Sequence, residues 1–166
     1  MKKLREVLTQ LSDQQKLHTL QQKYSIWSDW TPLHWAARRG HTEIISTLLT
    51  SLQSSAYRLK LLMVYDMYYR PLHEAADCGH TESVKMILDC LTPDQQIRMM
   101  SVQDCDYGNT AIHIEGETAM QCAERWGQTD TVRMLRPYQQ RVEQLQQEEE
   151  QRRLRQYRKS LSGKIM

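Results

Sequence analysis

The chain has 166 residues, of which 40% are hydrophobic and 25% are charged, and its formal net charge is +2. This length suits one domain, and the composition excludes a disordered chain. The longest apolar run, within KLLMVY at 60–65, is too short to cross a membrane, and the small net charge does not indicate a nucleic-acid partner for the body of the chain.

The N-terminal residues and the cysteines indicate the cellular compartment in which the protein resides. MKKLREVLTQL lacks the apolar stretch and cleavage site of a signal peptide, so we expect a cytoplasmic protein, with the nucleus as the alternative, and reduced thiols. The four cysteines are 12, 15 and 17 residues apart, without the close pairs that zinc sites recruit. We therefore expect no metal and no cofactor. The alternative, in which the fold brings distant cysteines together into a cluster, stays open.

Residues 1–25 are predicted to cap the N-terminal end of the structure. LREVLTQL at 4–11 aligns with VKMILDCL at 84–91, which indicates the second helix of an incomplete copy of a repeated unit. Such a capping helix turns one face to solvent. A short linker helix is expected to follow, starting near Asp13.

The repeated unit is most complete at 31–43, TPLHWAARRGHTE, and returns 39 residues later as RPLHEAADCGHTE. A third string, TAMQCAERWGQTDTVRML at 118–135, aligns without gaps to 31–48. Thr-Pro favours a helix start, paired alanines let helices approach closely, and a glycine ends the first helix in a left-handed cap. Apolar residues at helical spacing then predict a second helix. We expect about three such repeats within 26–136, near 31–50, 70–90 and 108–136.

The pattern T-P-L-H-x-A-A followed by G-H-x-E resembles the signature of the ankyrin repeat family. This resemblance implies an all-α fold, a solenoid of stacked helix–turn–helix units with short β-hairpin fingers, followed here by a C-terminal helix. It also implies that the histidines tie consecutive repeats together or shape the turns, and perform no chemistry. The residues given this structural role are Thr31, Pro32, His34, Gly40, His41, Pro71, His73, Gly79, His80, Thr110, His113, Thr118 and Gly127.

The spacing departs from the ankyrin pattern. The family's usual period is about 33 residues, whereas the period here is 39 to 40. The surplus predicts a short extra helix in each linker, at 11–20, 54–63 and 91–100. Hairpins with turns near Asp66 to Tyr69 and Asp104 to Asn109 are expected to lead into the next repeats.

In the last repeat, two strings that each resemble the start of the repeated unit lie only eight residues apart, within 108–127. In one interpretation the first opening extends the hairpin and the second starts the final helix pair. Alternatively, residues 112–123 form one long helix, which Gly116 disfavours. Gln121 and Gln128 replace the two histidines of the unit, as expected of a last repeat that lacks a downstream partner.

Residues 137–166 form a charged, Gln-rich tail of helix-forming residues, beginning at Pro137. Its apolar residues are sparse, and no heptad pattern persists over the three or four heptads that a coiled coil needs. Six basic and no acidic residues lie within 151–166, after the acidic run at 148–150. A solvated helix is favoured over a dimer seam, and a basic patch for membrane, RNA or nuclear import is the minor alternative.

The leading functional hypothesis is a non-enzymatic module, expected to be a monomer, that binds another protein or a peptide. In ankyrin proteins partners usually bind the concave face formed by hairpins and first helices. Charges on this face run from basic through acidic to basic, which suggests a mixed-charge peptide. The residues that the resemblance places on this face are rich in Trp, Tyr and Arg, the types that dominate interface hot spots. They are Trp27, Trp30, Trp35, Arg38, Arg39, Met67, Tyr68, Tyr69, Glu74, Asp77, Cys78, Tyr107, Asn109, Arg125 and Trp126.

Two rival hypotheses remain. An enzyme or metal site needs a nucleophile or base against an orienting group, yet the repeat explains the recurring histidines and no catalytic or phosphate-binding motif occurs, so no small-molecule substrate is expected. In the other, the basic tail at 151–166 binds anionic lipid or nucleic acid and the repeats serve as a spacer.

Overall fold

The computed structural model describes residues 2–23, 30–64, 69–102 and 117–162. These residues form ten α-helices and no strand. The helices are α1 (Lys2–Thr9), α2 (Asp13–Leu20), α3 (Pro32–Arg38), α4 (Thr42–Ser51), α5 (Ser55–Leu62), α6 (Pro71–Asp77), α7 (Thr81–Asp89), α8 (Pro93–Met100), α9 (Ala119–Arg125) and α10 (Thr129–Ser162).

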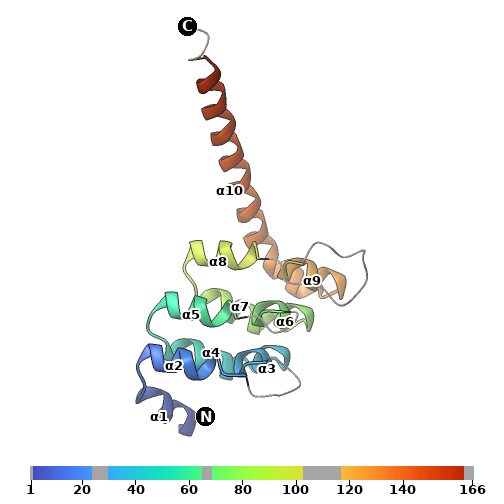
Figure 1. The fold of residues 1–166 in the computed structure, drawn as a ribbon. Coiled ribbons are helices and arrows are strands. Elements are labelled where there is room, and N and C mark those ends of the chain that lie inside the picture. Colours follow the sequence, from blue (N-terminus) through green and yellow to red (C-terminus); the bar gives the residue numbers. More distant parts are fainter. Residues whose placement is uncertain (1, 24–29, 65–68, 103–116, 163–166) are drawn as a thin grey trace.

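The helices stack in three columns (Figure 1). The first helices of the repeats, α3, α6 and α9, lie one above another, and the second helices, α4, α7 and the start of α10, form the adjacent column. The linker helices α2, α5 and α8 make the outer column, as the long repeat period predicts. α1 packs against α4. The fold class expected from the sequence, a helical ankyrin-type solenoid, is confirmed.

The core lies between these columns. Small residues on the first helices, Ala36, Ala75 and Ala123, are buried and allow close stacking. Large residues on the second helices, such as Ile45 and Ile87, fill the space beside them and are fully buried. Each such side chain stabilises the fold by about 1.5–3 kcal/mol relative to an exposed position.

Local capping sets the boundaries of several helices. The Thr92 hydroxyl accepts from the Gln95 amide and the Gln95 side chain accepts from Thr92 N–H, a reciprocal capping box at α8. Thr118 and Gln121 form the same box at α9, and Thr118 has extended backbone (φ −77°, ψ 162°). The final helix pair therefore starts at the second opening, and an uninterrupted helix over 112–123 is wrong.

The turn between the two helices of each repeat depends on a left-handed glycine. Gly40, Gly79 and Gly127 have φ values of 65°, 72° and 67°, a region that costs other residues about 1–2 kcal/mol. A Cβ on Gly40 would also lie 2.6 Å from Nδ1 of His80, which reaches back from the next repeat. A Cβ on Gly79 would collide with the Gln128 side chain, whereas one on Gly127 would meet nothing within 4 Å.

Replacing these glycines with alanine separates the two effects. Gly127→Ala is expected to lower the free energy of unfolding by about 1 kcal/mol, because only backbone strain is added. Gly79→Ala also displaces the Gln128 side chain and breaks its bond to the Asp77 carbonyl, so we expect a loss of at least about 2 kcal/mol. Urea denaturation of both variants measures the difference. Equal losses would show that the packing of Gln128 on Gly79 contributes nothing.

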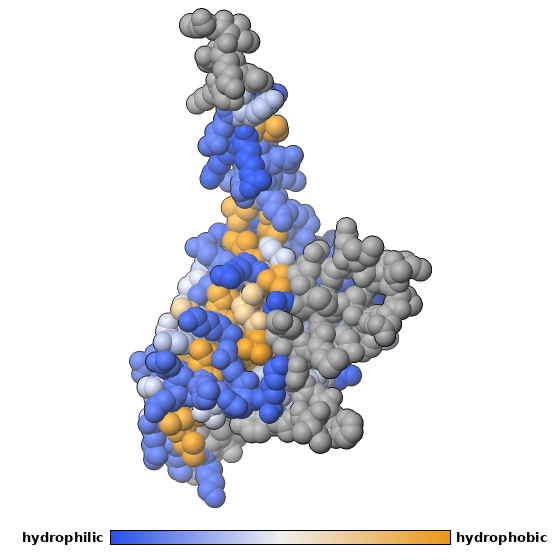
Figure 2. Space-filling model, viewed as in Figure 1, coloured by the Kyte–Doolittle hydropathy of each residue, from blue (hydrophilic) through white to orange (hydrophobic). Residues whose placement is uncertain are grey.

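Helix α10 is 34 residues long and passes through Pro137 without a break. The tail expected to begin at Pro137 is thus a continuation of the last repeat's second helix. Leu135 and Val142 are buried, so the first turns beyond Pro137 still pack on the repeats. The remainder projects away from the stack (Figure 1) and is mainly hydrophilic (Figure 2).

Three sequence predictions concern residues outside the described ranges. The hairpin turns near Asp66 to Tyr69 and Asp104 to Asn109 fall almost entirely on 65–68 and 103–116, and the repeat residues Thr110 and His113 also lie there.

Among the described helices, none is both long and apolar enough to cross a membrane.

Candidate functional site

The fourth-position histidines link consecutive repeats through the backbone. Nε2 of the buried His34 lies 3.1 Å from the Tyr69 carbonyl, so it must carry the proton and donate. Nδ1 then accepts from the hydroxyl of Thr31 at 2.8 Å. Nε2 of His73 donates in the same way to the Val102 carbonyl at 3.2 Å. These bonds place the starts of α3 and α6 against the segments that follow their own repeats, at Tyr69 and Val102.

A second set of links runs in the opposite direction. Nε2 of His80 donates to the Arg38 carbonyl at 3.0 Å, and Nε2 of Gln128 donates to the Asp77 carbonyl at 3.2 Å. Gln128 thus binds the preceding repeat just as His80 does. The expectation that Gln128 reflects a missing downstream partner is wrong, because the bond at this position points upstream.

Aromatic and basic side chains gather at the N-terminal end of the first-helix column. Trp30 and Trp35 meet edge to face, with ring centroids 4.5 Å apart and planes inclined by 63°. The Arg38 guanidinium lies 5.5 Å from the Trp30 ring and its Nη1 lies 3.0 Å from Oε2 of Glu74 in the next repeat. Trp35 is 44% exposed.

The other end of the column carries a similar arrangement around Arg125. Its Nη2 donates to the Tyr69 hydroxyl at 2.6 Å and lies 3.2 Å from both Asp77 Oδ1 and Glu117 Oε2. Its guanidinium also lies 5.6 Å from the ring of Trp126, which is 57% exposed. Burial raises the pKa of the Tyr69 hydroxyl, although the bond from Arg125 opposes this.

The alternating charges predicted for this face are paired with one another. Arg38, Asp77 and Arg125 occupy the same position in successive repeats. Arg38 pairs with Glu74, and Asp77 pairs with Arg125. These ion pairs hold adjacent repeats together, so the pattern of charge does not by itself indicate a mixed-charge peptide.

Two predicted partner contacts are interior side chains. Tyr69 is 3% exposed and Glu74 is 2% exposed, because the neighbouring repeats cover them. They position Arg125 and Arg38 and cannot offer a free contact surface. Of the other predicted contacts, Trp35, Arg39 and Trp126 are exposed, while Asp77 and Cys78 are half-buried.

Five predicted contacts, Trp27, Met67, Tyr68, Tyr107 and Asn109, lie outside the described residues. Sequence reasoning also overlooked Glu117, which pairs with Arg125 at 3.2 Å. It precedes the helix cap Thr118 by one residue, a position for which the repeat pattern gives no signal.

The three thiols within the described residues, Cys78, Cys90 and Cys122, give no indication of nucleophilic catalysis. Burial and the adjacent Glu117 carboxylate raise the pKa of Cys122 to about 12, so this thiol stays protonated at neutral pH. Burial also raises the pKa of Cys78 and of Cys90. In the described part of the chain, no group of three or more His, Cys, Asp or Glu residues is arranged to hold a metal ion.

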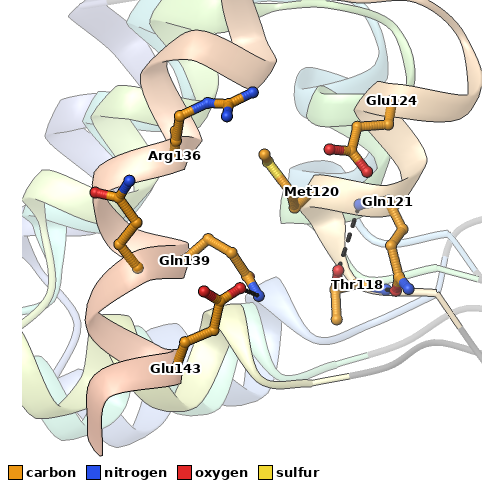
Figure 3. A pocket seen from close by; sticks show the side chains of 8 residues that line it. Thr118, Met120, Gln121, Glu124, Arg136, Gln139 and Glu143 are labelled. Carbon is orange, nitrogen blue, oxygen red and sulfur yellow. Dashed lines mark hydrogen bonds between the residues drawn. The ribbon is translucent and has the colours of Figure 1, made fainter.

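A hollow of about 520 Å³ separates α9 from α10 (Figure 3). Glu124 faces it from α9, and Arg136 and Glu143 face it from α10, with Gln139 Nε2 donating to Glu143 Oε1 at 3.1 Å. The sequence did not predict this hollow. Its lining has no histidine, cysteine or serine. The lining residues are Thr118, Met120, Gln121, Glu124, Arg136, Gln139, Gln140 and Glu143.

Comparison with known proteins identifies the family. A family model for ankyrin repeats matches residues 2–99, with three copies. The matched range begins at α1 and stops before α9, whose helix pair aligns with those of the repeats at 31–50 and 70–90. No curated protein matches the chain. The stacked helix pairs, the histidine links between them and the match over more than half of the sequence lead to one conclusion: the chain belongs to the ankyrin repeat family.

Proposed function

We propose that this chain is a non-enzymatic module that binds another protein through the exposed aromatic residues of its first-helix column. Ankyrin repeats are generally protein–protein interaction modules. The observation that carries the proposal is the exposure of Trp35 and Trp126, 44% and 57%, at the two ends of that column. Tryptophan and arginine are the residue types that most often dominate interface energetics.

The immediate surroundings of the two indoles suit them to binding. Trp35 is braced by Trp30, and Trp126 lies beside the Arg125 guanidinium. Side chains held in this way lose little conformational freedom on binding, which lowers the entropic cost of association. Because Arg38 and Arg125 already pair with carboxylates, we propose that apolar contact contributes more to affinity than charge does. We further propose a monomeric adaptor with a cytoplasmic address, or alternatively a nuclear one.

A double variant tests the role of the two indoles. Trp35→Ala with Trp126→Ala is expected to weaken partner binding about 700-fold, because each indole is expected to contribute about 2 kcal/mol. The measurement is affinity capture from a lysate, followed by titration of the captured protein. Helical circular dichroism should stay unchanged, because neither side chain is buried in the core.

The matched control removes two exposed apolar residues from the tail, Leu145→Ala with Tyr157→Ala, which are 40% and 63% exposed. This control is expected to retain the partner. The proposed surface would be contradicted if the indole variant still captured the partner protein, or if only the tail variant lost it.

The alternative, in which residues 151–166 bind anionic lipid or nucleic acid, has less support. Arg152 and Arg153 pair with Glu148 and Glu149 one turn earlier, at 3.7 Å and 2.6 Å. Such pairs reduce the charge that the exposed helix offers to a polyanion. Binding that weakens steeply with salt and disappears on deleting 140–166 would favour the tail instead.

A further inference from the structure

A second hollow, of about 380 Å³, lies where α1, α2 and α4 meet. α1 packs against α4, and α2 belongs to the outer column (Figure 1). The residues that line this N-terminal hollow include Arg5 and Leu8 of α1, Lys16 of α2 and Thr47 of α4. Small-molecule sites usually measure about 300–1,000 Å³. The N-terminal hollow is therefore large enough for a small organic molecule.

The lining of the N-terminal hollow is basic and rich in hydroxyl groups. Apart from Leu8, it consists of two basic residues and five residues with hydroxyl groups, and none of these described residues is acidic. The side chain of Arg5 is 63% exposed, and its Nη2 lies 4.0 Å from Oε1 of Glu43. This distance is too long for a hydrogen bond, so the guanidinium keeps its donors for a ligand.

Lys16 is the second cation of the lining, and it is only 7% exposed. Its Nζ donates to the Ser51 carbonyl at 2.7 Å and to Asp13 Oδ1 at 3.4 Å. Arg58, the equivalent residue of α5, makes the equivalent bond to the Cys90 carbonyl at 3.3 Å, so this bond is a repeated structural feature. An ammonium group has three protons. The third proton of Lys16 can therefore bind a ligand while the structural bonds stay intact.

Thr47 distinguishes this place from its equivalents in the later repeats. The residues at the same repeat position are Met86 and Met134, and both pack against the core. Thr47 is 6% exposed, and its Oγ1 has no hydrogen-bond partner within the described part of the chain. A buried hydroxyl group without a partner destabilises a fold. A ligand in the N-terminal hollow would supply the partner that Thr47 lacks.

The other hydroxyl groups of the lining include three that already donate their protons. Those of Thr9, Thr50 and Ser51 donate to carbonyls of their own helices at 2.8, 2.7 and 2.7 Å. Such oxygens can accept a further hydrogen bond but cannot donate one. They suit hydroxyl groups of a ligand, whereas the two cations and the Thr47 hydroxyl suit an anion.

We propose that the N-terminal hollow binds a small phosphate monoester that carries hydroxyl groups, such as a sugar phosphate. Arg5, Lys16 and Thr47 come from three helices, so their donors approach from three sides. A tetrahedral phosphate has oxygens in three directions, whereas a carboxylate has two in one plane. Arginine binds phosphate through paired hydrogen bonds, and lysine binds it as a point charge. This site goes beyond the proposed function, whose indoles belong to the first-helix column.

Titration of the intact 166-residue protein, followed by amide chemical shifts, tests the site. The probes are glucose 6-phosphate, inorganic phosphate, glucose and acetate, at constant pH and ionic strength. We expect saturable shifts in α1, α2 and α4 with glucose 6-phosphate, half-complete near about 1 mM. Inorganic phosphate should bind more weakly because it leaves the acceptor hydroxyls unused. Glucose and acetate should cause no saturable shifts.

Two variants of Thr47 separate binding from folding. Thr47→Met introduces the side chain found in the later repeats, which occupies the hollow, and should weaken glucose 6-phosphate binding at least about tenfold. Thr47→Val removes only the hydroxyl group and should weaken binding about tenfold. In urea denaturation without ligand, Thr47→Val should be no less stable than the unmodified chain, because the hydroxyl it removes has no partner among the described residues.

Arg5→Gln should also weaken binding at least about tenfold, since the guanidinium contacts the phosphate. Lys85→Gln is the matched control, because Lys85 aligns with Arg5, is exposed and does not line the hollow. It removes the same charge and should leave binding unchanged. The double variant Trp35→Ala with Trp126→Ala should also bind glucose 6-phosphate normally, so this proposal and the proposed function fail separately.

Several results would overturn the site. An absence of saturable shifts up to about 20 mM glucose 6-phosphate would show that water alone fills the hollow. Unchanged binding by Thr47→Met, or equal weakening by Arg5→Gln and Lys85→Gln, would show that the phosphate binds elsewhere. Saturation by acetate at the same concentration would assign the hollow to carboxylates. Equally tight binding of inorganic phosphate would overturn the assignment to a monoester with hydroxyl groups.

Discussion

Lowering the pH from 7 to 4 is expected to remove about 3 kcal/mol of stability through His73 alone. Burial lowers the pKa of His73 from 6.5 to about 3, outweighing the bond to the Val102 carbonyl, which raises it. Between these two values the unfolded chain binds a proton that the folded protein excludes. Stability is therefore fully present above about pH 6.5 and falls by about 1.4 kcal/mol per pH unit below it, until the folded pKa is reached.

Urea denaturation at pH 7, 5.5 and 4 measures this loss. His73→Gln removes the titrating group and should flatten the decline between pH 6.5 and 4, although it is less stable at pH 7. His41→Gln is the matched control, because His41 is exposed, and it should decline as the unmodified chain does. A His73→Gln variant with an unchanged decline would show that other groups cause the acid sensitivity.

Replacing His34 with alanine is expected to lower the free energy of unfolding by about 3 kcal/mol. The imidazole is completely buried, and its removal leaves a cavity between α3 and the segment entering α6. The Tyr69 carbonyl and the Thr31 hydroxyl each lose a partner in a place that water does not reach. Buried polar groups without partners cost about 1–3 kcal/mol each, which adds to the loss of packing.

The equivalent residue of the last repeat provides a matched control. Gln121 is exposed, and its side chain accepts only from Thr118 N–H within its own helix turn. Gln121→Ala should therefore cost about 1 kcal/mol, the usual effect of losing a helix cap. Chemical denaturation at pH 7 compares the two. A loss below about 1 kcal/mol for His34→Ala would mean that the link between repeats contributes little to stability.

The repeats and the linker helices could be predicted because their signals are local. Thr31-Pro32 marks a helix start and Gly40 marks a helix end within one short string. Ser12 and Thr92 similarly cap the linker helices through residues three positions later. Such interactions depend on neighbours in the sequence, so they can be predicted from one amino-acid sequence alone.

The burial of some predicted partner contacts could not be predicted in the same way. Spacing places Tyr69 and Glu74 on the face of the first-helix column, but whether they are exposed depends on the next repeat. The ion pairs from Arg38 and Arg125 connect residues 36 and 48 positions apart. No local pattern specifies them. The direction of the Gln128 bond likewise became evident only from the packed repeats.

The continuity of α10 has a mechanical consequence. The twenty residues after Val142, up to Ser162, extend about 30 Å at roughly 1.5 Å per residue. They form a lever whose fulcrum is the last repeat, since Leu135 and Val142 anchor its base in the core. A sideways load applied to the far end acts with that full arm on the contacts that α10 makes with α7, α8 and α9. Bending of the tail is therefore expected to strain the last repeat, whose second helix is the base of the lever.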